Sequence, residues 1–350
     1  MNATKKFNTK ERNMKKSMKA MNNPDYKTDT LKCGTGFSAI GTPEQAIKNL
    51  SIDHTNEFMI EIDRYARETF LANHSVNNIY TDITSIDPAS VADIDLFVFG
   101  SPCQSYSIQG KRLGMNDTRG TLIYNGLSIL KEKSPKYFIY ENVKGMVNHD
   151  NGNTFAVIKA AFEELDYNIS YQVLNAKNYG AAQNRERLFI VGIRKDIKQK
   201  FTFPEPQPVS NCVNNYISKG GDFSNYLFDE EVVPHISKKQ TDIQHKFDIP
   251  RLSYASDKRV ISTNGIAPCF LAGNTKCKFY DEVNGLFRYL TEDELKRIQG
   301  FPEDFKFPVS KSQTRKQIGN SIYVGVLEAI LKNLIPEHYF TASQVAAMAA

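Results

Sequence analysis

The strongest constraint on the fold is a regular alternation of short apolar runs and amphipathic segments between about residues 30 and 200. The apolar runs have the length of β-strands, and the segments between them carry apolar residues at the three- and four-residue spacing of helices. The expected strands are 30–37, 58–62, 95–99, 137–140, 169–174 and 187–193, and the expected helices include 63–74, 121–133 and 154–165. This pattern predicts a Rossmann-like α/β fold with a parallel, doubly wound sheet.

The character of the sequence changes after residue 200. A proline-rich stretch at 201–208 marks a boundary, and residues 204–285 are rich in Asn, Ser, Gly and Lys without a helical period. Capping signals predict helices that begin at Thr42 and Thr291, and a last helix is expected over 321–334. We therefore expect a basic tail at 1–29, a main domain of 30–203 plus 286–340, a smaller loop-rich domain at 204–285, and a tail at 341–350.

Composition excludes some classes of protein. The chain has no apolar run of about 18 residues and no apolar signal core, so neither a membrane span nor secretion is expected. Five scattered cysteines without a CxxC pair fit a reducing compartment, and we expect a cytoplasmic protein with no metal site. The net charge of +5 says little, because residues 1–20 alone carry +6. That basic tail either attracts phosphates weakly or is a solvated extension without function.

A candidate nucleophile follows one of the expected strands. Cys103 lies in a Gly-Ser-Pro-Cys-Gln segment directly after strand 95–99, and ligands bind at the carboxyl ends of parallel strands. A cysteine reacts as a thiolate, which nearby positive charge stabilises, and Lys111, Arg112 and Arg119 lie in the following loop. Taken alone, this cysteine is more simply explained as a small core residue.

Two other strand ends carry polar residues. Glu141 and Asn142 follow strand 137–140, where a carboxylate is costly to bury unless it binds or reacts. Arg185 and Arg187 lead into strand 187–193 and can meet an anion or a carbonyl group. Each has a structural explanation on its own, such as Glu141 in a salt bridge. Together with Cys103 they favour a reactive site at one edge of the sheet.

The order and spacing of these motifs resemble those of the DNA (cytosine-5)-methyltransferases over about residues 30–335. The motifs are, in chain order, Phe37-Ser-Ala-Ile-Gly41, Glu61-Ile-Asp63, Asp82-Ile83, Pro102-Cys-Gln104, Glu141-Asn-Val143, Gln183 to Arg187, Gln299-Gly-Phe-Pro302 and Gly319-Asn-Ser321. Each string is modestly specific by itself. All of them in family order leave little room for chance.

The resemblance implies a mechanism. The Cys103 thiolate would add to C6 of a cytosine, and C5 would then attack the methyl group of S-adenosyl-L-methionine. Glu141 would hydrogen-bond N3 and the exocyclic N4, Arg187 would hold O2, and Arg185 would support the site. Because this chemistry cannot reach a stacked base, the cytosine must be flipped out of duplex DNA.

The resemblance also implies a set of cofactor-binding residues. Phe37 would pack on S-adenosyl-L-methionine, and Glu61 would bind its ribose. Asp82 would read the adenine amino group, with Ile62 and Ile83 on the two faces of the ring. The other residues expected in this pocket are Ser38, Ile40, Gly41, Ser101, Pro102, Leu122, Asn320, Ser321 and Ile322.

By the same resemblance, residues 204–285 would form a target-recognition domain that reads a short sequence of double-stranded DNA. The residues expected to contact DNA are Gln104, Gln109, Lys111, Arg119, Arg259, Ser262 and Thr263. A monomer is compatible with one short site and one flipped base, and no membrane partner is expected. The sequence leaves open whether a cognate restriction endonuclease accompanies the enzyme.

The cofactor loop departs from the family pattern at two positions. Thr35 stands where the family has an aspartate, and Ala39 stands where it has a glycine that tolerates a positive φ. A DNA-binding relative with impaired catalysis is therefore one alternative, and a family member that acts on tRNA is another. The long segment 204–285 favours duplex DNA. A nicotinamide-dependent oxidoreductase is excluded, because no GxGxxG motif follows the first strand.

Overall fold

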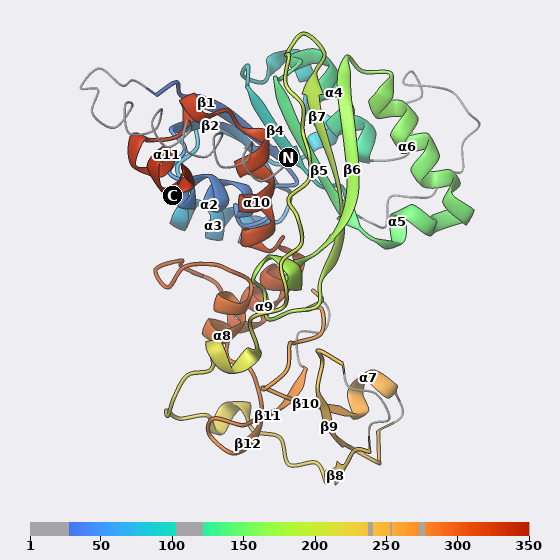
Figure 1. The fold of residues 1–350 in the computed structure, drawn as a ribbon, viewed down its shortest axis with the longest axis vertical. Helices are drawn as coiled ribbons and strands as arrows, with labels where there is room; N and C mark the ends of the chain where they lie inside the picture. Colours follow the sequence, from blue (N-terminus) through green and yellow to red (C-terminus); the bar gives the residue numbers. More distant parts are fainter. Residues whose placement is uncertain (1–27, 103–121, 237–240, 253, 273–276, 350) are drawn as a thin grey trace, which may run out of the picture.

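The computed structural model describes residues 28–102, 122–236, 241–252, 254–272 and 277–349. They form two lobes, each built on one sheet (Figure 1). The large lobe contains a seven-stranded sheet of order β3-β2-β1-β4-β5-β7-β6, and the small lobe contains a five-stranded sheet of order β12-β11-β10-β9-β8. The doubly wound α/β fold predicted from the sequence is confirmed.

The large-lobe strands are β1 (Leu31–Gly36), β2 (His54–Ile60), β3 (Asn78–Tyr80), β4 (Leu96–Phe99), β5 (Tyr137–Val143), β6 (Tyr167–Asn175) and β7 (Glu186–Arg194). The helices that accompany them are α2 (Thr42–Asn49), α3 (Arg64–Asn73), α4 (Leu122–Lys133), α5 (Gly145–Asn148), α6 (Asn153–Glu163), α10 (Val324–Leu334) and α11 (Ala342–Ala349). None of the helices in the described part of the chain is long and apolar enough to cross a membrane.

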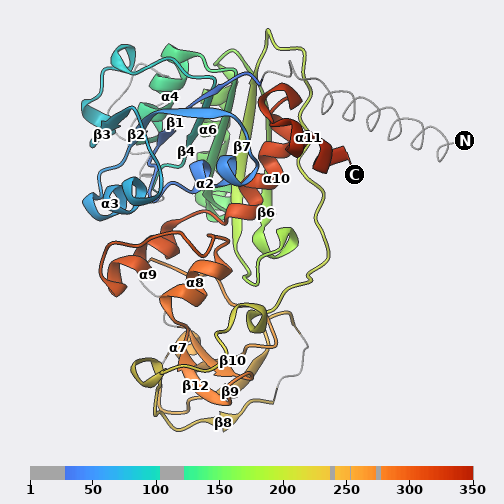
Figure 2. The same ribbon diagram turned by 90° about the vertical axis from the view of Figure 1, so that its left-hand side faces the viewer.

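The small lobe contains β8 (Val233–Pro234), β9 (His245–Asp248), α7 (Ala255–Lys258), β10 (Arg259–Ser262), β11 (Lys278–Asp281) and β12 (Leu286–Tyr289). Helices α8 (Glu292–Ile298) and α9 (Lys311–Asn320) lie between the two sheets (Figure 2). The second sheet therefore extends past residue 285, and the expected tail at 341–350 contains α11. Strands of two to four residues are too short to produce a periodic pattern, which explains why only loops were expected here.

Strand β7 departs from the parallel sheet expected from the sequence. It pairs antiparallel with both β5 and β6, whereas the other neighbouring strands in this sheet are parallel. A parallel pair needs a crossover of a dozen residues or more, usually a helix. The connection from β6 to β7 contains only one short 3₁₀ turn at Ala176–Tyr179, so the chain turns back on itself.

Helices cover both faces of the large sheet, and alternate strand residues face each layer (Figure 1). In β4, Leu96 and Val98 pack with α2 and α10, whereas Phe97 and Phe99 pack with α4 and α6. All four side chains are buried. The central strands are buried on both faces, which accounts for their continuous apolar sequences.

Two helix starts test the capping signals. Thr291 accepts from the Glu294 backbone N–H, and Glu294 reciprocates, so the predicted capping box of α8 is confirmed. Thr42 is already inside α2, and the N-cap is Gly41 with a φ of 85°. The prediction of Thr42 as the cap is therefore wrong, because the preceding loop enters the helix through a left-handed residue that favours glycine.

A buried ion network joins the small lobe to α8. Arg288 of β12 is fully buried, and its guanidinium lies 2.7 Å from Asp281 of β11 and 2.7 Å from Glu294 of α8. The Arg288 guanidinium also lies over the Phe223 ring, 4.2 Å from its centroid. Because both carboxylates pair with one guanidinium away from water, the sheet and the helix are held in one arrangement.

We predict that Gly192→Ala strongly destabilises the large lobe. Gly192 of β7 lies opposite Phe138 of β5, and an added Cβ would collide with the Phe138 ring. That ring cannot move aside, because it packs against Phe162 and Tyr167 at centroid distances of 5.1 and 5.0 Å. Overpacking of this kind costs about 1–3 kcal/mol. Urea unfolding measures the loss of stability.

The matched control is Gly145→Ala, because nothing lies within 4 Å of the Cβ added there. This variant should be at least as stable as the unchanged protein. Equal stability of the two variants would contradict the predicted collision at Gly192.

Candidate active site

The carboxyl ends of β1, β2, β4 and β5 and the start of β7 surround a cavity of about 420 Å³. The residues expected there from the sequence that line it are Phe37, Glu61, Ile62, Asp82, Ile83, Ser101, Pro102, Leu122, Glu141, Arg185, Arg187 and Asn320. A smaller recess of about 60 Å³ is lined by Ser38, Ser321 and Ile322 together with Phe37 and Asn320. Residues from seven of the eight motifs, far apart in the sequence, are thus brought to one place.

Two of the expected cofactor residues do not line either space. Ile40 is fully buried in the apolar core between the sheet and α2, and Gly41 caps that helix. Both anchor the loop on the side away from the cavity, Ile40 in the core and Gly41 at the start of α2.

Glu141 and Arg187 form an ion pair at the base of the larger cavity. The distance from Arg187 Nε to Glu141 Oε1 is 3.1 Å, and their side chains are 14% and 15% exposed. Burial raises the pKa of the Glu141 carboxyl, and the charges of Arg187 and Arg185 oppose that rise. The pair offers a ligand an acid and a guanidinium side by side, which suits a ring that carries both donors and acceptors.

Arg185 has a different environment from Arg187. It is 3% exposed and donates to the backbone carbonyls of Phe270, Gly319 and Ser321 at 2.9, 3.0 and 2.7 Å. Burial lowers the pKa of its guanidinium to about 10. Arg185 thus fixes the backbone that carries Asn320 into the cavity, and it acts as a positioning residue.

Cys103 lies outside the described residues, as do Gln104, Gln109, Lys111 and Arg119. The segment that leads to Cys103 is described as far as Pro102, and two side chains of β5 hold it. Asn142 donates to the Ser101 carbonyl at 2.9 Å, and the Tyr140 hydroxyl pairs with the Ser101 hydroxyl at 2.9 Å. Asn142 Nδ2 also donates to the Tyr140 hydroxyl at 2.8 Å.

Tyr140 was not expected in the site. It is fully buried, and burial raises the pKa of its hydroxyl. The sequence does hold a signal, because residues 140 and 142 of a strand point to the same face and one of them was already a candidate. Tyr140 and Asn142 together fix the backbone next to the expected nucleophile.

The loop after β1 adopts an unusual backbone conformation. Phe37 and Ala39 have positive φ values of 55° and 48°, which disfavour residues other than glycine. The Ala39 N–H donates to Glu61 Oε2 at 2.9 Å, and the Ser38 hydroxyl accepts from the Ile60 N–H at 3.2 Å. The loop therefore keeps a glycine-like conformation at Ala39 because β2 holds it in place.

A carboxylate lies next to Thr35, where the family pattern has an aspartate. The Thr35 hydroxyl is within hydrogen-bond distance of both Ser38 Oγ at 2.7 Å and Glu44 Oε1 at 2.8 Å. Glu44 comes from the first turn of α2 and is 1% exposed. Glu44 was not expected from the sequence. An acid in the first turn of a helix, with buried residues on either side of it, does indicate a buried carboxylate with a partner.

The side of the cavity expected to hold adenine has apolar walls and two acids. Glu61 also accepts from the Asp63 N–H at 2.8 Å, and burial raises the pKa of its carboxyl. Asp82 accepts from the Thr84 N–H and hydroxyl at 2.9 and 2.7 Å, which lowers its pKa. Ile62 is 73% exposed while it lines the cavity, so a large apolar face is available to a ligand.

The expected DNA contacts in the small lobe fall into two groups. Arg259 is exposed and lines a second cavity of that lobe. Ser262 and Thr263 are buried, and both bind Glu282: the Ser262 hydroxyl donates to its carboxylate at 2.6 Å, and Thr263 Oγ1 accepts from its N–H at 2.9 Å. In this arrangement neither side chain reaches the surface, so both hold the end of β10.

Comparison with known proteins agrees with this geometry. The profile of the family described as C-5 cytosine-specific DNA methylase matches residues 31–336. Type II methyltransferase M.HaeII of Haemophilus aegyptius is 38% identical over 320 residues, which are 89% of this chain and 93% of that protein. Type II methyltransferase M.NgoBI of Neisseria gonorrhoeae is 37% identical over 319 residues, which are 88% of this chain and 92% of that protein.

The fold is also found among solved structures. A mutant of DNMT2 from Spodoptera frugiperda superposes with a TM-score of 0.67 at 20% identity, over 88% of this chain and all of that one. Fold, site and sequence together define a DNA cytosine-5-methyltransferase. The chain belongs to the C-5 cytosine-specific DNA methylase family, and it is of the type found in restriction–modification systems.

We predict that Glu44→Gln changes how stability depends on pH. Burial raises the pKa of the Glu44 carboxyl from 4.5 to about 7 in the folded protein. Between these pH values the folded state holds a proton that the unfolded state has lost. The stability that protonated Glu44 contributes to the fold is therefore complete below pH 4.5 and is lost as the pH rises through about 7. The glutamine retains an acceptor for Thr35 and does not titrate.

Relative to the variant, the unchanged protein should lose about 2.5 kcal/mol of stability between pH 5 and pH 8. Urea unfolding at the two pH values measures this difference, and groups that titrate in both proteins cancel from it. A difference that does not change with pH would show that Glu44 ionises normally.

Proposed function

We propose that the enzyme methylates C5 of a flipped-out cytosine within a short, specific sequence of double-stranded DNA. One observation carries the proposal: the Glu141–Arg187 ion pair opens into the same cavity as Phe37 and Glu61. A base held by the first pair would therefore lie next to a cofactor held by the second. The Gly100–Pro102 segment, which leads to Cys103, lines the same cavity.

The cavity fits S-adenosyl-L-methionine as the methyl donor. The exposed face of Ile62 and the side chains of Phe37 and Ile83 offer apolar contacts to an adenine ring, and Glu61 and Asp82 offer acceptors for hydroxyl and amino groups. When bound, this cofactor supplies a methyl group on a positively charged sulfur. Asn320, held in place through Arg185, would bind the end nearest the base.

The residues around the base have complementary tasks. The Cys103 thiolate would add to C6 of cytosine, and Glu141 with its raised pKa would donate to N3 as negative charge develops there. Arg187 would donate to O2. After C5 has accepted the methyl group, its proton leaves to water, the Cys103–C6 bond breaks to restore the thiolate, and N3 returns its proton to Glu141.

The small lobe would read the target sequence, with Arg259 as one of its contacts. Reaching the base requires flipping, since neither C6 nor C5 is accessible inside a stacked duplex. We propose that the enzyme works as a monomer in the cytoplasm. A restriction endonuclease with the same target would be a functional partner rather than a bound one.

Transfer of labelled methyl groups to duplex DNA and to tRNA, followed by bisulfite sequencing of DNA from cells that express the protein, tests the proposal. Label should enter duplex DNA as 5-methylcytosine at one short sequence. Label in tRNA alone would overturn the choice of substrate. Absence of label together with absence of S-adenosyl-L-methionine binding in calorimetry would favour a DNA-binding relative without catalysis.

We predict that Cys103→Ala lowers the methyl-transfer rate by more than about a hundredfold and leaves DNA binding measurable, because covalent activation of the ring is lost. Single-turnover kinetics on duplex DNA measure the rate. Duplex DNA that contains 5-fluorocytosine should trap the enzyme, since fluorine blocks the final elimination.

The control variant is Cys212→Ala, which changes a cysteine of the small lobe outside the cavity and should retain normal rates. Mapping of the trapped adduct to any cysteine other than Cys103 would contradict the mechanism.

A further inference from the structure

Three potential metal ligands converge at one edge of the small-lobe sheet, on β9 and directly after the edge strand β8. β8 pairs with β9 so that Val233 lies opposite Asp248, and His235, two residues after Val233, points to the same face as Asp248. In a regular strand His245 would point to the opposite face from Asp248. However, Val260 and Ile261 of β10 lie opposite Phe247 and His245, so Lys246 is an extra residue in β9.

This bulge at Lys246 reverses the alternation of side chains in β9. His245 therefore faces the same side as Asp248 and meets His235. The distance from His235 Nδ1 to Asp248 Oδ2 is 2.7 Å, and that from His245 Nε2 to Asp248 Oδ1 is 3.0 Å. One potential ligand atom from each of the three residues lies within 4.8 Å of the other two. Bulges are typically retained where they re-aim a side chain.

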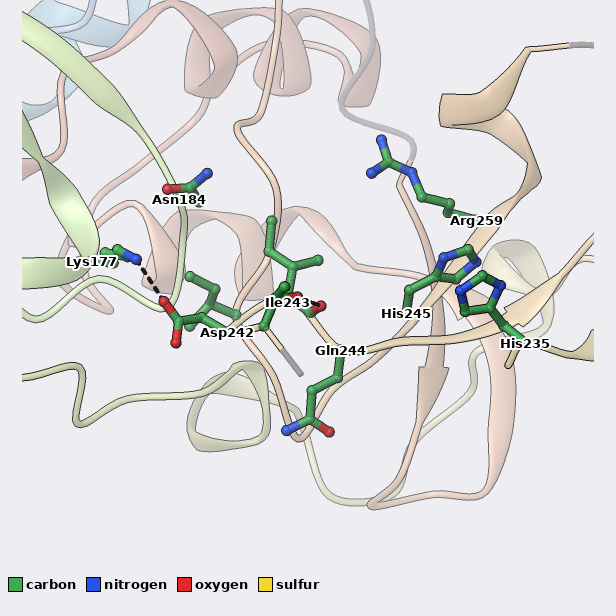
Figure 3. Close-up of a pocket in the computed structure, with 10 residues that line it drawn as sticks. Lys177, Asn184, His235, Asp242, Ile243, Gln244, His245 and Arg259 are labelled. Atoms are coloured by element: carbon green, nitrogen blue, oxygen red, sulfur yellow. Dashed lines mark hydrogen bonds and ion pairs between the residues drawn. The ribbon is translucent and has the colours of Figure 1, made fainter. Parts of the chain in front are cut away.

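The two imidazole rings lie face to face, with centroids 3.6 Å apart and an interplanar angle of 15° (Figure 3). They line a cavity of about 700 Å³ together with Arg259 and Gln244. The three side chains are 19–32% exposed, so an ion can reach them from this cavity. No ion pair with Lys or Arg is found for Asp248 among the described residues, which leaves its charge to the two imidazoles.

We infer that His235, His245 and Asp248 form a binding site for a divalent transition-metal ion, with Zn²⁺ as the representative ligand. Bonds of about 2.0–2.2 Å to a tetrahedral ion place the ligand atoms roughly 3.3 Å apart, about 0.3 to 0.6 Å more than the distances from the two histidines to the Asp248 oxygens. Each ring must also turn about its Cβ–Cγ bond to direct its lone pair at the ion. The fourth position faces the cavity and takes water.

The donor set determines which ions bind. Two imidazole nitrogens and one carboxylate suit Zn²⁺, Co²⁺ and Ni²⁺, whereas Mg²⁺ and Ca²⁺ require sites made of oxygen. The ion would link β8 to β9 through side chains. β8 has only two residues, so such a link would fix the edge of the sheet beside Arg259. The site lies outside the catalytic cavity and does not depend on the methyl-transfer mechanism.

Titration of the untagged, chelator-treated full chain with Co²⁺ and Zn²⁺ tests the site. Calorimetry should give one binding site per chain, and Co²⁺ should produce visible absorption bands without the near-ultraviolet charge-transfer band of thiolate ligands. His235→Ala and His245→Ala should each weaken binding by about a hundredfold or more, because only two protein ligands remain. Mg²⁺ and Ca²⁺ should give no heat.

Two controls separate the site from general effects. His338→Ala removes an exposed histidine of the large lobe and should leave metal binding unchanged. Circular dichroism and DNA methyl transfer by the site variants report whether they remain folded. Metal uptake that persists in His235→Ala, or that shows a thiolate band, would overturn the inference. So would the absence of metal binding to the unchanged protein at concentrations of about 10 μM.

Discussion

The arrangement of the active site depends on one buried guanidinium. Arg185 donates to three backbone carbonyls, one from the small lobe and two from the last turn and C-cap of α9. Carbonyl groups away from water need donors, and a buried cation needs acceptors, so each satisfies the other. Arg187, two residues later, meets Glu141 because the start of β7 pairs with the end of β5. Removal of Arg185 would take one donor from each of these three carbonyls where the cavity meets the small lobe, although the Ser321 carbonyl would still accept from the Gln299 amide at 2.9 Å.

Much of the fold and the outline of the site could be predicted from the sequence, because both depend on local patterns. Apolar runs located the central strands, and polar residues at strand ends located Glu141 and Arg187. Tyr140 and Glu44 were missed because their roles depend on neighbours far along the chain. Ser262 was expected to contact DNA for the same reason. Its polar sequence neighbours do not reveal that Glu282, 20 residues later, binds its hydroxyl.

The two departures in the cofactor loop are accommodated by different means. The left-handed conformation at Ala39 is held by a hydrogen bond to Glu61, a residue that also lines the larger cavity. The missing aspartate at position 35 is matched by Glu44, which reaches the Thr35 hydroxyl from the other side of the loop. In both cases a side chain from outside the loop forms a hydrogen bond to the position that departs from the family pattern. Sequence motifs therefore understate how far such a site can be rebuilt.

The reversed direction of β7 has a consequence for how the small lobe is attached. Its first residues lie beside the last residues of β5, so Arg187 reaches the cavity. The strand then runs to Arg194, next to the start of β5 and away from the cavity. The chain returns along the outside of the large lobe before it enters the small lobe (Figure 2). It leaves that lobe again through β12 and α8. The small lobe is thus an insertion that the chain enters once and leaves once, and a different lobe could be exchanged there without rethreading the sheet.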